Sequence, residues 1–418
     1  MKTCSACHRL FPDDGGFCPV DGQKLVPTAD APRPKDFEDP RVGQTICGGR
    51  YEIWRKVADG GMGRVYQALD TREERSVALK ILHADVAMQE VAVERFKREF
   101  ECSRALPHDF IVEVLAFERT EDKSYALVME YLEGEELRTL LKREKRLPPE
   151  RVIRMVAEVA VGLQSAHDRQ VVHRDMKPDN IFLCGRPEGD LSKILDFGSV
   201  RDNSAGAKKL TVLGTTIGSP FYMAPEQAQA LPSLDHRADV WSMAAIAYEC
   251  LAGTVPFRGN NGPAILLAIL SNDPQPPSEL GCPATFDAVI ESALAKNPDI
   301  RTPTIGKLAD DLGHAYGLTG DHHEWATVPQ DELGRRIAEG LPAALAKHAA
   351  EAAQRADTAA MDAAFKNDDR FAAGSEGGPA AFGEDMVMGV PKGPPKWIFA
   401  ALGAVVLLGI LGAIVAMR

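Results

Sequence analysis

The chain has 418 residues, 45% of them hydrophobic and 26% charged, which is enough for one large folded domain with smaller parts. Its formal net charge of -12 argues against a nucleic-acid partner, because phosphate backbones are bound by basic surfaces. Eight cysteines are too few for a disulfide scaffold, and no apolar stretch follows Met1, so we expect a reducing compartment rather than secretion.

Residues 1–26 form a cysteine module. Two residues separate Cys4 from Cys7, and Cys18-Pro-Val-Asp21-Gly repeats the turn with an aspartate in place of the second cysteine. This pattern resembles a zinc ribbon, in which a tetrahedral Zn²⁺ ion replaces a hydrophobic core. The expected ligands are Cys4, Cys7, Cys18 and, by its spacing, Asp21, with His8 as the alternative by its chemistry. The other interpretation is a disordered tail with reduced thiols.

Residues 27–44 are rich in proline and charge and are expected to form a linker. A globular body follows, from residue 45 to residue 315. Its first part contains β-branched runs such as residues 76–82, and its later part contains long amphipathic runs such as residues 150–166. We therefore predict an α+β fold with strands mostly early and helices mostly late.

The first part of this body contains groups suited to nucleotide phosphates. Lys80, fifteen residues beyond Val65, lies in a predicted strand from which its ammonium would hold the α and β phosphates. Glu99, on the following amphipathic stretch, is expected to fix that ammonium by an ion pair. Before them comes a turn whose missing side chains would let backbone N–H groups approach phosphate oxygens, at Gly60, Gly61 and Gly63. Taken singly, a plain hairpin, a surface lysine and a solvated glutamate would explain these residues.

Three motifs follow in order: residues 173–180 (HRDMKPDN), Asp196-Phe197-Gly198 at 21 residues after Asp175, and Ala224-Pro225-Glu226. With the glycine-rich turn and Lys80 before them, they resemble the protein kinase family over residues 50 to 312. The resemblance implies a bilobal kinase fold, with a β-rich small lobe, an α-helical large lobe and ATP in the cleft between them.

The same resemblance implies roles for individual residues. Asp175 would be the base that accepts the proton of the substrate hydroxyl, and Lys177 would neutralise charge on the transferring phosphoryl group. Asn180 and Asp196 would hold Mg²⁺, or Mn²⁺ in its place. Lys80 and Glu99 complete the catalytic set. The implied ATP pocket contains Val57, Val65 and Ala78 over the adenine, Phe182 below it, Met129 as the gate, Glu130, Tyr131 and Leu132 as the hinge, and Glu136 at the ribose.

Two further features of the resemblance concern architecture and type. Asp239 resembles a buried carboxylate that braces the catalytic loop, and Glu226 with Arg301 resembles a structural ion pair. Lys177 and residues 218–222 resemble Ser/Thr kinases rather than tyrosine kinases, and residues 60–63 and 224–228 resemble bacterial members. The chain departs from the family at Ala58, where a glycine is usual.

The loop between Asp196 and Glu226 contains Thr211, Thr215 and Thr216. A phosphothreonine there would find a cation in Arg174, so we expect activation by autophosphorylation. Unmodified loop threonines are the alternative.

Residues 316–396 are expected to form an alanine-rich helical spacer and a flexible juxtamembrane tether. The uncharged run 397–417 predicts a single transmembrane helix, and Lys392 and Lys396 before it place the kinase on the cytoplasmic side of a bacterial inner membrane. Gly409 and Ala413 are spaced for close helix packing, which suggests a homodimer.

Three functions are compatible with these features. The first is an active membrane-tethered Ser/Thr kinase that acts on protein substrates, and the second is a pseudokinase scaffold that binds nucleotide. The third is an adaptor centred on the zinc module. Intact Lys80, Asp175, Asn180 and Asp196 favour the active kinase.

Overall fold

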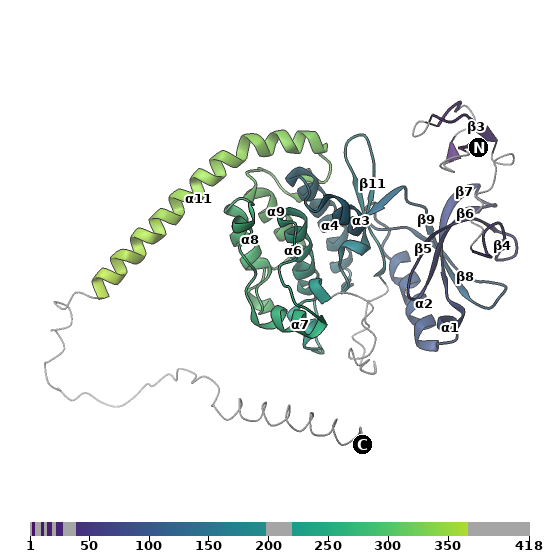
Figure 1. Ribbon diagram of the computed structural model, residues 1–418, viewed down its shortest axis with the longest axis horizontal. Helices are drawn as coiled ribbons and strands as arrows, with labels where there is room; N and C mark the ends of the chain where they lie inside the picture. The colour runs from purple at the N-terminus through teal and green to yellow at the C-terminus, as the bar shows by residue number, and fades with distance from the viewer. Residues whose placement is uncertain are drawn as a thin grey trace, which may run out of the picture. The chain divides into compact units, whose positions relative to one another are not determined.

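The computed structural model describes residues 2–4, 10–11, 15–18, 22–27, 39–197 and 220–366 (Figure 1). The chain divides into two compact units, Met1–Gln354 and Arg355–Arg418. All contacts reported below lie within the first unit.

The cysteine module contains a small antiparallel sheet in the order β2-β1-β3. Its strands are β1 (Lys2–Cys4), β2 (Leu10–Phe11) and β3 (Leu25–Pro27). Cys4 and Cys18 are buried together with Leu25. The other two predicted zinc ligands, Cys7 and Asp21, and the alternative His8 lie outside the described residues. Among the residues that are described, no group of three His, Cys, Asp or Glu side chains is arranged to hold a metal ion.

The small lobe is a six-stranded antiparallel sheet in the order β4-β5-β6-β7-β9-β8. Its strands are β4 (Thr45–Ile46), β5 (Tyr51–Asp59), β6 (Gly63–Asp70), β7 (Arg75–Leu82), β8 (Val114–Arg119) and β9 (Tyr125–Glu130). Alternation along β7 sends Val77 and Leu79 to one face and Ala78 and Lys80 to the other.

Different segments cover the two faces of this sheet. Helix α2 (Glu90–Arg104), preceded by α1 (Ala84–Ala87), packs Phe96 against Leu82 and Leu127 on one face. On the other face, Val42, Ile46 and Cys47 pack against the residues of β5 to β9 that point away from α2. These three belong to residues 39–48, so a part of the chain that we expected to be linker lies on the sheet.

The large lobe is built around α4 (Pro149–His167) and α6 (Arg237–Ala252), both buried along most of their length (Figure 1). Pro149 at the first turn suits a helix start, and Gly253, with φ of 77°, ends α6 in the left-handed conformation. The large lobe also contains a three-stranded sheet, made of β10 (Gly134–Glu136), β11 (Ile181–Cys184) and β12 (Leu191–Ile194).

The remaining short elements complete the large lobe. They are α3 (Leu137–Glu144), α5 (Pro225–Ala228), α7 (Gly262–Ser271), α8 (Thr285–Ala293), α9 (Ile305–Ala315), α10 (His322–Trp325) and the 3-10 turns η2 (Pro178–Asn180), η4 (Pro220–Tyr222), η5 (Pro277–Leu280) and η6 (Pro298–Ile300).

The hydrophobic core continues beyond residue 315. Trp325 and Leu333 are fully buried in the large-lobe core, and Ile337 is nearly so. The backbones of Gly317 and Gly340 approach so closely that a β-carbon on Gly340 would lie 2.1 Å from the Gly317 carbonyl oxygen. The start of the expected spacer therefore packs on the large lobe.

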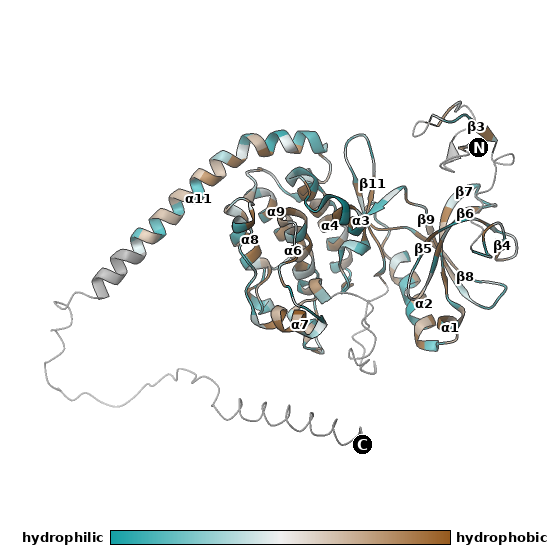
Figure 2. Ribbon diagram, in the orientation of Figure 1, coloured by the Kyte–Doolittle hydropathy of each residue, from teal (hydrophilic) through white to brown (hydrophobic). Residues whose placement is uncertain are grey.

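Helix α11 (Gln330–Lys366) covers the alanine-rich part of the expected spacer, and hydrophilic and hydrophobic residues are interspersed along the coloured part of the helix (Figure 2). In the described part of the chain, no helix combines the length and the apolar character needed to cross a membrane. The predicted span 397–417, with Gly409 and Ala413, lies outside that part.

Candidate active site

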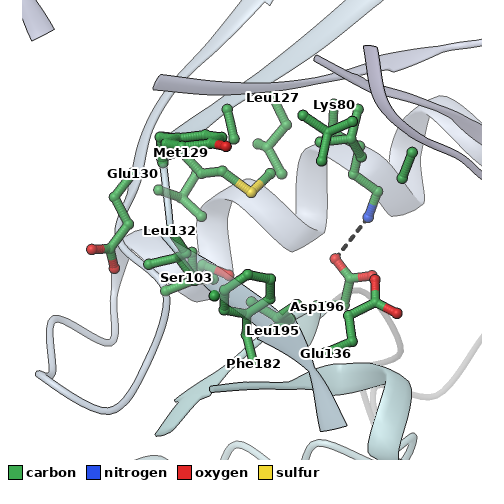
Figure 3. Close-up of a pocket in the computed structure, with 18 of the residues that line it drawn as sticks. Lys80, Ser103, Leu127, Met129, Glu130, Leu132, Glu136, Phe182, Leu195 and Asp196 are labelled. Atoms are coloured by element: carbon green, nitrogen blue, oxygen red, sulfur yellow. Dashed lines mark hydrogen bonds and ion pairs between the residues drawn. The ribbon is translucent and has the colours of Figure 1, made fainter. Parts of the chain in front are cut away.

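A cavity of about 790 Å³ lies between the small-lobe sheet and the sheet β10-β11-β12 (Figure 3). Strand alternation explains its roof, because Ala78 and Lys80 are two residues apart on β7 and point to the same face. Of the predicted nucleotide residues, those that line the cavity are Val57, Val65, Ala78, Lys80, Met129, Glu130, Leu132, Glu136 and Phe182, with Tyr131 beside them.

The roof and the floor of this cavity are apolar. Val57 and Val65 come from the hairpin β5–β6, and Phe182 comes from β11, opposite Glu136 of β10 in the register. Burial beside other carboxylates raises the pKa of Glu136 above its ordinary value. An apolar slot with a few polar groups at its rim suits a flat purine base with a polar tail.

The glycine-rich turn joins β5 to β6 at the edge of the site. The Gly60 N–H donates to the Gly63 carbonyl at 3.0 Å, which closes the turn. A β-carbon on Gly63 would lie 2.2 Å from the Ile81 carbonyl oxygen of β7. Gly60, Gly61 and Gly63 do not line the cavity itself. Glycine is therefore required at position 63 because β6 packs closely against β7. The sequence indicated a different reason, the approach of phosphate oxygens to the backbone.

Lys80 and Asp196 face each other in the cavity (Figure 3), and Glu99 joins them in its lining. The Lys80 ammonium lies 2.9 Å from Glu99 Oε1 and 2.7 Å from Asp196 Oδ1. Burial opposes the charge on Lys80, but the carboxylates of Asp196 and Glu99 outweigh it and raise the pKa of the ammonium. Burial also opposes the charge on Asp196, but Lys80 lowers the pKa of that carboxyl below its ordinary range. Burial raises the pKa of Glu99, which Lys80 counters in part.

The catalytic loop, residues 173–180, carries a second cation–carboxylate pair. The Lys177 ammonium donates to Asp175 Oδ2 at 2.7 Å, and the Asp175 side chain is 44% exposed. The Asn180 amide nitrogen donates to the Asp175 carbonyl at 2.6 Å, and the Leu195 N–H donates to the Asn180 carbonyl at 2.9 Å. A reachable carboxylate and a nearby ammonium are the groups that deprotonate a hydroxyl and neutralise a phosphoryl group.

A buried carboxylate holds this loop in place. Asp239 accepts the N–H of His173 at 2.9 Å and that of Arg174 at 2.8 Å. Arg174 has φ of 67°, a conformation that is costly for a side chain with a β-carbon and that Asp239 therefore helps to maintain. Burial opposes the charge of Asp239, and the bond from His167 helps to lower the pKa of the carboxyl.

The catalytic loop also contacts the segment that carries Asp196. His173 Nε2 bonds the Leu195 carbonyl at 2.9 Å, and its ring meets the edge of the Phe197 ring at 4.8 Å between centroids. Phe197 is fully buried. The catalytic loop and the segment that carries Asp196 are thus held by one hydrogen-bonded network.

The residues suited to a metal ion are Asp196 and Asn180. Asp196 is ionised beside Lys80, and Asn180 uses its amide nitrogen on the Asp175 carbonyl, which leaves the amide oxygen as its free ligand atom. Carboxylate and amide oxygens are hard ligands of the kind that Mg²⁺ prefers. The donor set therefore fits Mg²⁺ held together with nucleotide phosphates.

Two side chains that lie near the site were not identified from the sequence. Lys193 of β12 bonds the hinge residue Glu130 at 2.7 Å, although nothing in its surroundings in the sequence sets it apart. Arg138 of α3 bonds Asp179 and Glu249, each at 3.2 Å, and so fixes the turn next to Asn180. An arginine in an amphipathic helix gives no signal of such a role.

Two curated proteins of known type are similar to this chain. The chain is 36% identical over 267 residues to "Serine/threonine-protein kinase pkn3" of Myxococcus xanthus, covering 62% of this chain and 48% of that protein. It is 36% identical over 268 residues to "Serine/threonine-protein kinase PknB" of Mycobacterium tuberculosis, covering 63% and 42%. The match therefore spans less than half the length of either relative.

A solved structure and a family model agree with this context. The crystal structure of the M. tuberculosis PknI kinase domain is similar with a TM-score of 0.52 and 26% sequence identity, over 66% of this chain and 99% of that one. The protein kinase domain model matches residues 51–311, which include the cavity, the catalytic loop and the Asp239 brace. The kinase fold predicted from the motifs is thus confirmed, and the chain belongs to the protein kinase family.

Proposed function

We propose that this chain is an active ATP-dependent protein kinase that phosphorylates Ser or Thr hydroxyls of protein substrates. The observation that carries the proposal is the complete charged set, with Lys80 held by Glu99 and Asp196 in the cavity lining, and Asp175 paired with Lys177 on the loop that Asn180 joins to Leu195. The relatives named above are Ser/Thr-protein kinases, and Lys177, two residues after Asp175, resembles the Ser/Thr members of the family.

In this proposal each group has a task. Lys80 would bind the α and β phosphates, and Asp196 and Asn180 would hold Mg²⁺, which would supply positive charge to the phosphates. Asp175 accepts the proton of the substrate hydroxyl as the new oxygen–phosphorus bond forms and the bond to the β-phosphate oxygen breaks. Lys177 neutralises negative charge on the transferred group.

Loss of the base separates this function from a nucleotide-binding scaffold. Asp175→Asn should lower kcat on a generic protein acceptor by about 10²- to 10⁴-fold, while binding of Mg²⁺–ATP persists. Full-length wild-type protein that binds ATP but transfers no phosphate would favour the scaffold.

We further propose activation by autophosphorylation in the loop that contains Thr211, Thr215 and Thr216, which lie outside the described residues. Arg174, held next to Asp175, supports the proposal, because it supplies a cation for a phosphothreonine. Mass spectrometry of the purified protein with and without ATP tests it, and a loop that gains no phosphate would contradict it.

Anchoring to the bacterial inner membrane through residues 397–417, with the kinase domain cytoplasmic, is also a proposal, supported by the uncharged run and by Lys392 and Lys396. A homodimer through Gly409 and Ala413 extends it. Membrane fractionation of the full chain, with Gly409→Leu analysed for oligomeric state, tests both. Full-length protein recovered without membranes, or an unchanged oligomer, would count against the respective proposal.

We propose that the cysteine module binds Zn²⁺. The support is the burial of Cys4 next to Cys18, fourteen positions later in the chain, in a segment with almost no other core. Zinc analysis should find one ion per chain in the wild type and none in Cys4→Ser/Cys18→Ser. An equal zinc content in both proteins would exclude these thiolates as ligands.

A further inference from the structure

Residues 39–48, here called the strap, form a well-anchored layer on the small lobe, immediately before the segment that matches the kinase family. The strap exchanges backbone hydrogen bonds with β5, from the Gly43 N–H to the Ile53 carbonyl at 2.8 Å and from the Ile53 N–H to the Gln44 carbonyl at 2.9 Å. It then continues into the pairing of β4 with β5. The strap is therefore part of the sheet.

The far edge of the sheet holds the strap as well. Arg41 forms an ion pair with Asp122 at 2.5 Å, and Glu121 accepts the N–H groups of Cys47 and Gly48 at 3.1 and 2.7 Å. Both carboxylates lie in the turn between β8 and β9. The strap thus crosses the face of the sheet that is opposite to the nucleotide cavity.

One carboxylate joins the strap to the roof of the cavity. Asp39 is 5% exposed, and its Oδ2 accepts the Tyr66 hydroxyl at 3.0 Å and lies 3.4 Å from Arg64 Nη1. Arg64 and Tyr66 flank Val65, which lines the cavity. Because neighbouring side chains on a strand point to opposite faces, Asp39 holds the hairpin directly behind the residue that would cover the adenine.

The environment of Tyr66 shows that this contact is specific. Tyr66 is 1% exposed, and burial together with the bond to Asp39 raises the pKa of its hydroxyl to about 12. A buried hydroxyl that loses its acceptor carries a desolvation cost, so the hairpin is most stable where Asp39 can reach it. Arg64 also bonds Asp59 at 2.9 Å, which ties both strands of the hairpin to the same charge network.

We infer that Asp39 is a positioning residue for nucleotide binding, which sets the roof of the cavity from behind through Tyr66 and Arg64. The inference rests on the proposed function only in taking ATP as the ligand. It makes the affinity for ATP depend on the contacts that Asp39, a residue before the family domain, makes with Tyr66 and Arg64, and it leaves the catalytic loop unaffected.

The test uses full-length protein and two separate readouts: the Kd of a fluorescent ATP analogue with Mg²⁺, and KM and kcat for ATP on a generic acceptor. Asp39→Ala should raise Kd and KM about 3- to 10-fold with kcat within twofold, because binding energy is lost without loss of catalytic groups. Asp39→Asn, which keeps an acceptor for Tyr66, should fall between the wild type and Asp39→Ala.

The control is Arg41→Ala, which removes a strap ion pair that does not touch the hairpin, and its Kd should stay within twofold of the wild type. A folded Asp39→Ala protein with a Kd within twofold of the wild type would overturn the inference. If Asp39→Ala does not fold, Tyr66→Phe is the deciding variant. Its Kd for the ATP analogue should rise about threefold, and an unchanged Kd would contradict the inference. Because Kd is measured without phosphoryl transfer, a protein that binds ATP but lacks activity would refute the proposed function alone.

Discussion

Arg301 and Glu226 form a bidentate ion pair inside the large lobe, with Nη1 to Oε1 at 2.7 Å and Nη2 to Oε2 at 2.9 Å. The Arg301 side chain is fully buried, and Nη1 also donates to the Arg237 carbonyl at 2.7 Å. Glu226 lies in the first turn of α5, just after the loop that contains the predicted phosphorylation sites. The pair therefore fastens the end of that loop to the start of α6.

Removal of Arg301 should be strongly destabilising. Arg301→Ala leaves Glu226 buried without its partner, and we expect the free energy of unfolding to fall by about 3–5 kcal/mol. Urea unfolding of the full chain measures it. Arg335→Ala, which breaks an exposed pair with Glu332, is the control and should cost less than about 1 kcal/mol. A loss for Arg301→Ala as small as that of the control would contradict the expectation.

The sequence predicted interactions that belong to local motifs. The Arg301–Glu226 pair, the Asp239 brace and the Lys80–Glu99 pair all join residues whose neighbours in the chain identify them. These residues lie far apart in the chain, so the pairs were predicted from the resemblance of the surrounding motifs to the protein kinase family and not from spacing alone. The α+β kinase fold followed from the same motifs.

The sequence did not indicate contacts made by residues outside those motifs. Asp39 lies in a stretch rich in proline and charge, and only the fold shows that the sheet needs a cover on that face. Likewise, Trp325 and Leu333 follow the last motif, at the start of the segment that was expected to be a spacer. Their burial depends on packing between segments far apart in the chain, which a one-dimensional pattern does not encode.

Glu99 offers a direct test of the charged cluster in the cavity. Glu99→Gln keeps a hydrogen-bond acceptor for Lys80 but removes the charge, so kcat/KM for ATP should fall about 10- to 100-fold. Steady-state kinetics measures the change. Glu101→Gln, two residues away on the exposed side of α2, is the matched control and should match the wild type. Equal kinetics for the two variants would show that Lys80 needs only Asp196.

The buried side chain of Glu158 should make the free energy of unfolding depend on pH. Burial raises its pKa from 4.5 to about 7, against the opposing bonds from Ser192 and Arg154. The folded protein therefore binds a proton more tightly than the unfolded chain, and this contribution to stability is full below pH 4.5 and is lost as the pH rises through 7. Between pH 5 and pH 7 the loss should be about 2 kcal/mol.

Urea unfolding of the wild type and Glu158→Gln at pH 5, 6, 7 and 8 isolates this contribution. The wild type should lose stability relative to the variant as the pH rises. The exposed Glu94 supplies Glu94→Gln as the control for loss of one negative charge. A difference between wild type and Glu158→Gln that stays constant with pH would refute the assignment.

Ala58 and Gly63 allow a paired test of the glycine-rich hairpin. Ala58 pairs with Val65 in the strand register and lines the cavity, and its φ is not positive, so the β-carbon fits its backbone. Ala58→Gly should therefore change KM for ATP by less than about threefold and cost about 0.5–1 kcal/mol of stability through added chain entropy.

Gly63→Ala should lower stability and ATP binding more than Ala58→Gly does, although it adds only the one carbon atom that Ala58→Gly removes. Its β-carbon would lie 2.2 Å from the Ile81 carbonyl oxygen, so β6 must move away from β7. We expect a loss of about 1–3 kcal/mol and a larger rise in KM for ATP than in Ala58→Gly. Thermal unfolding and ATP kinetics of both variants measure this, and a Gly63→Ala protein no worse than Ala58→Gly would show that the hairpin tolerates the added carbon. The expected contrast means that the departure at Ala58 is compatible with an active kinase, whereas the glycine at 63 is required by the sheet itself.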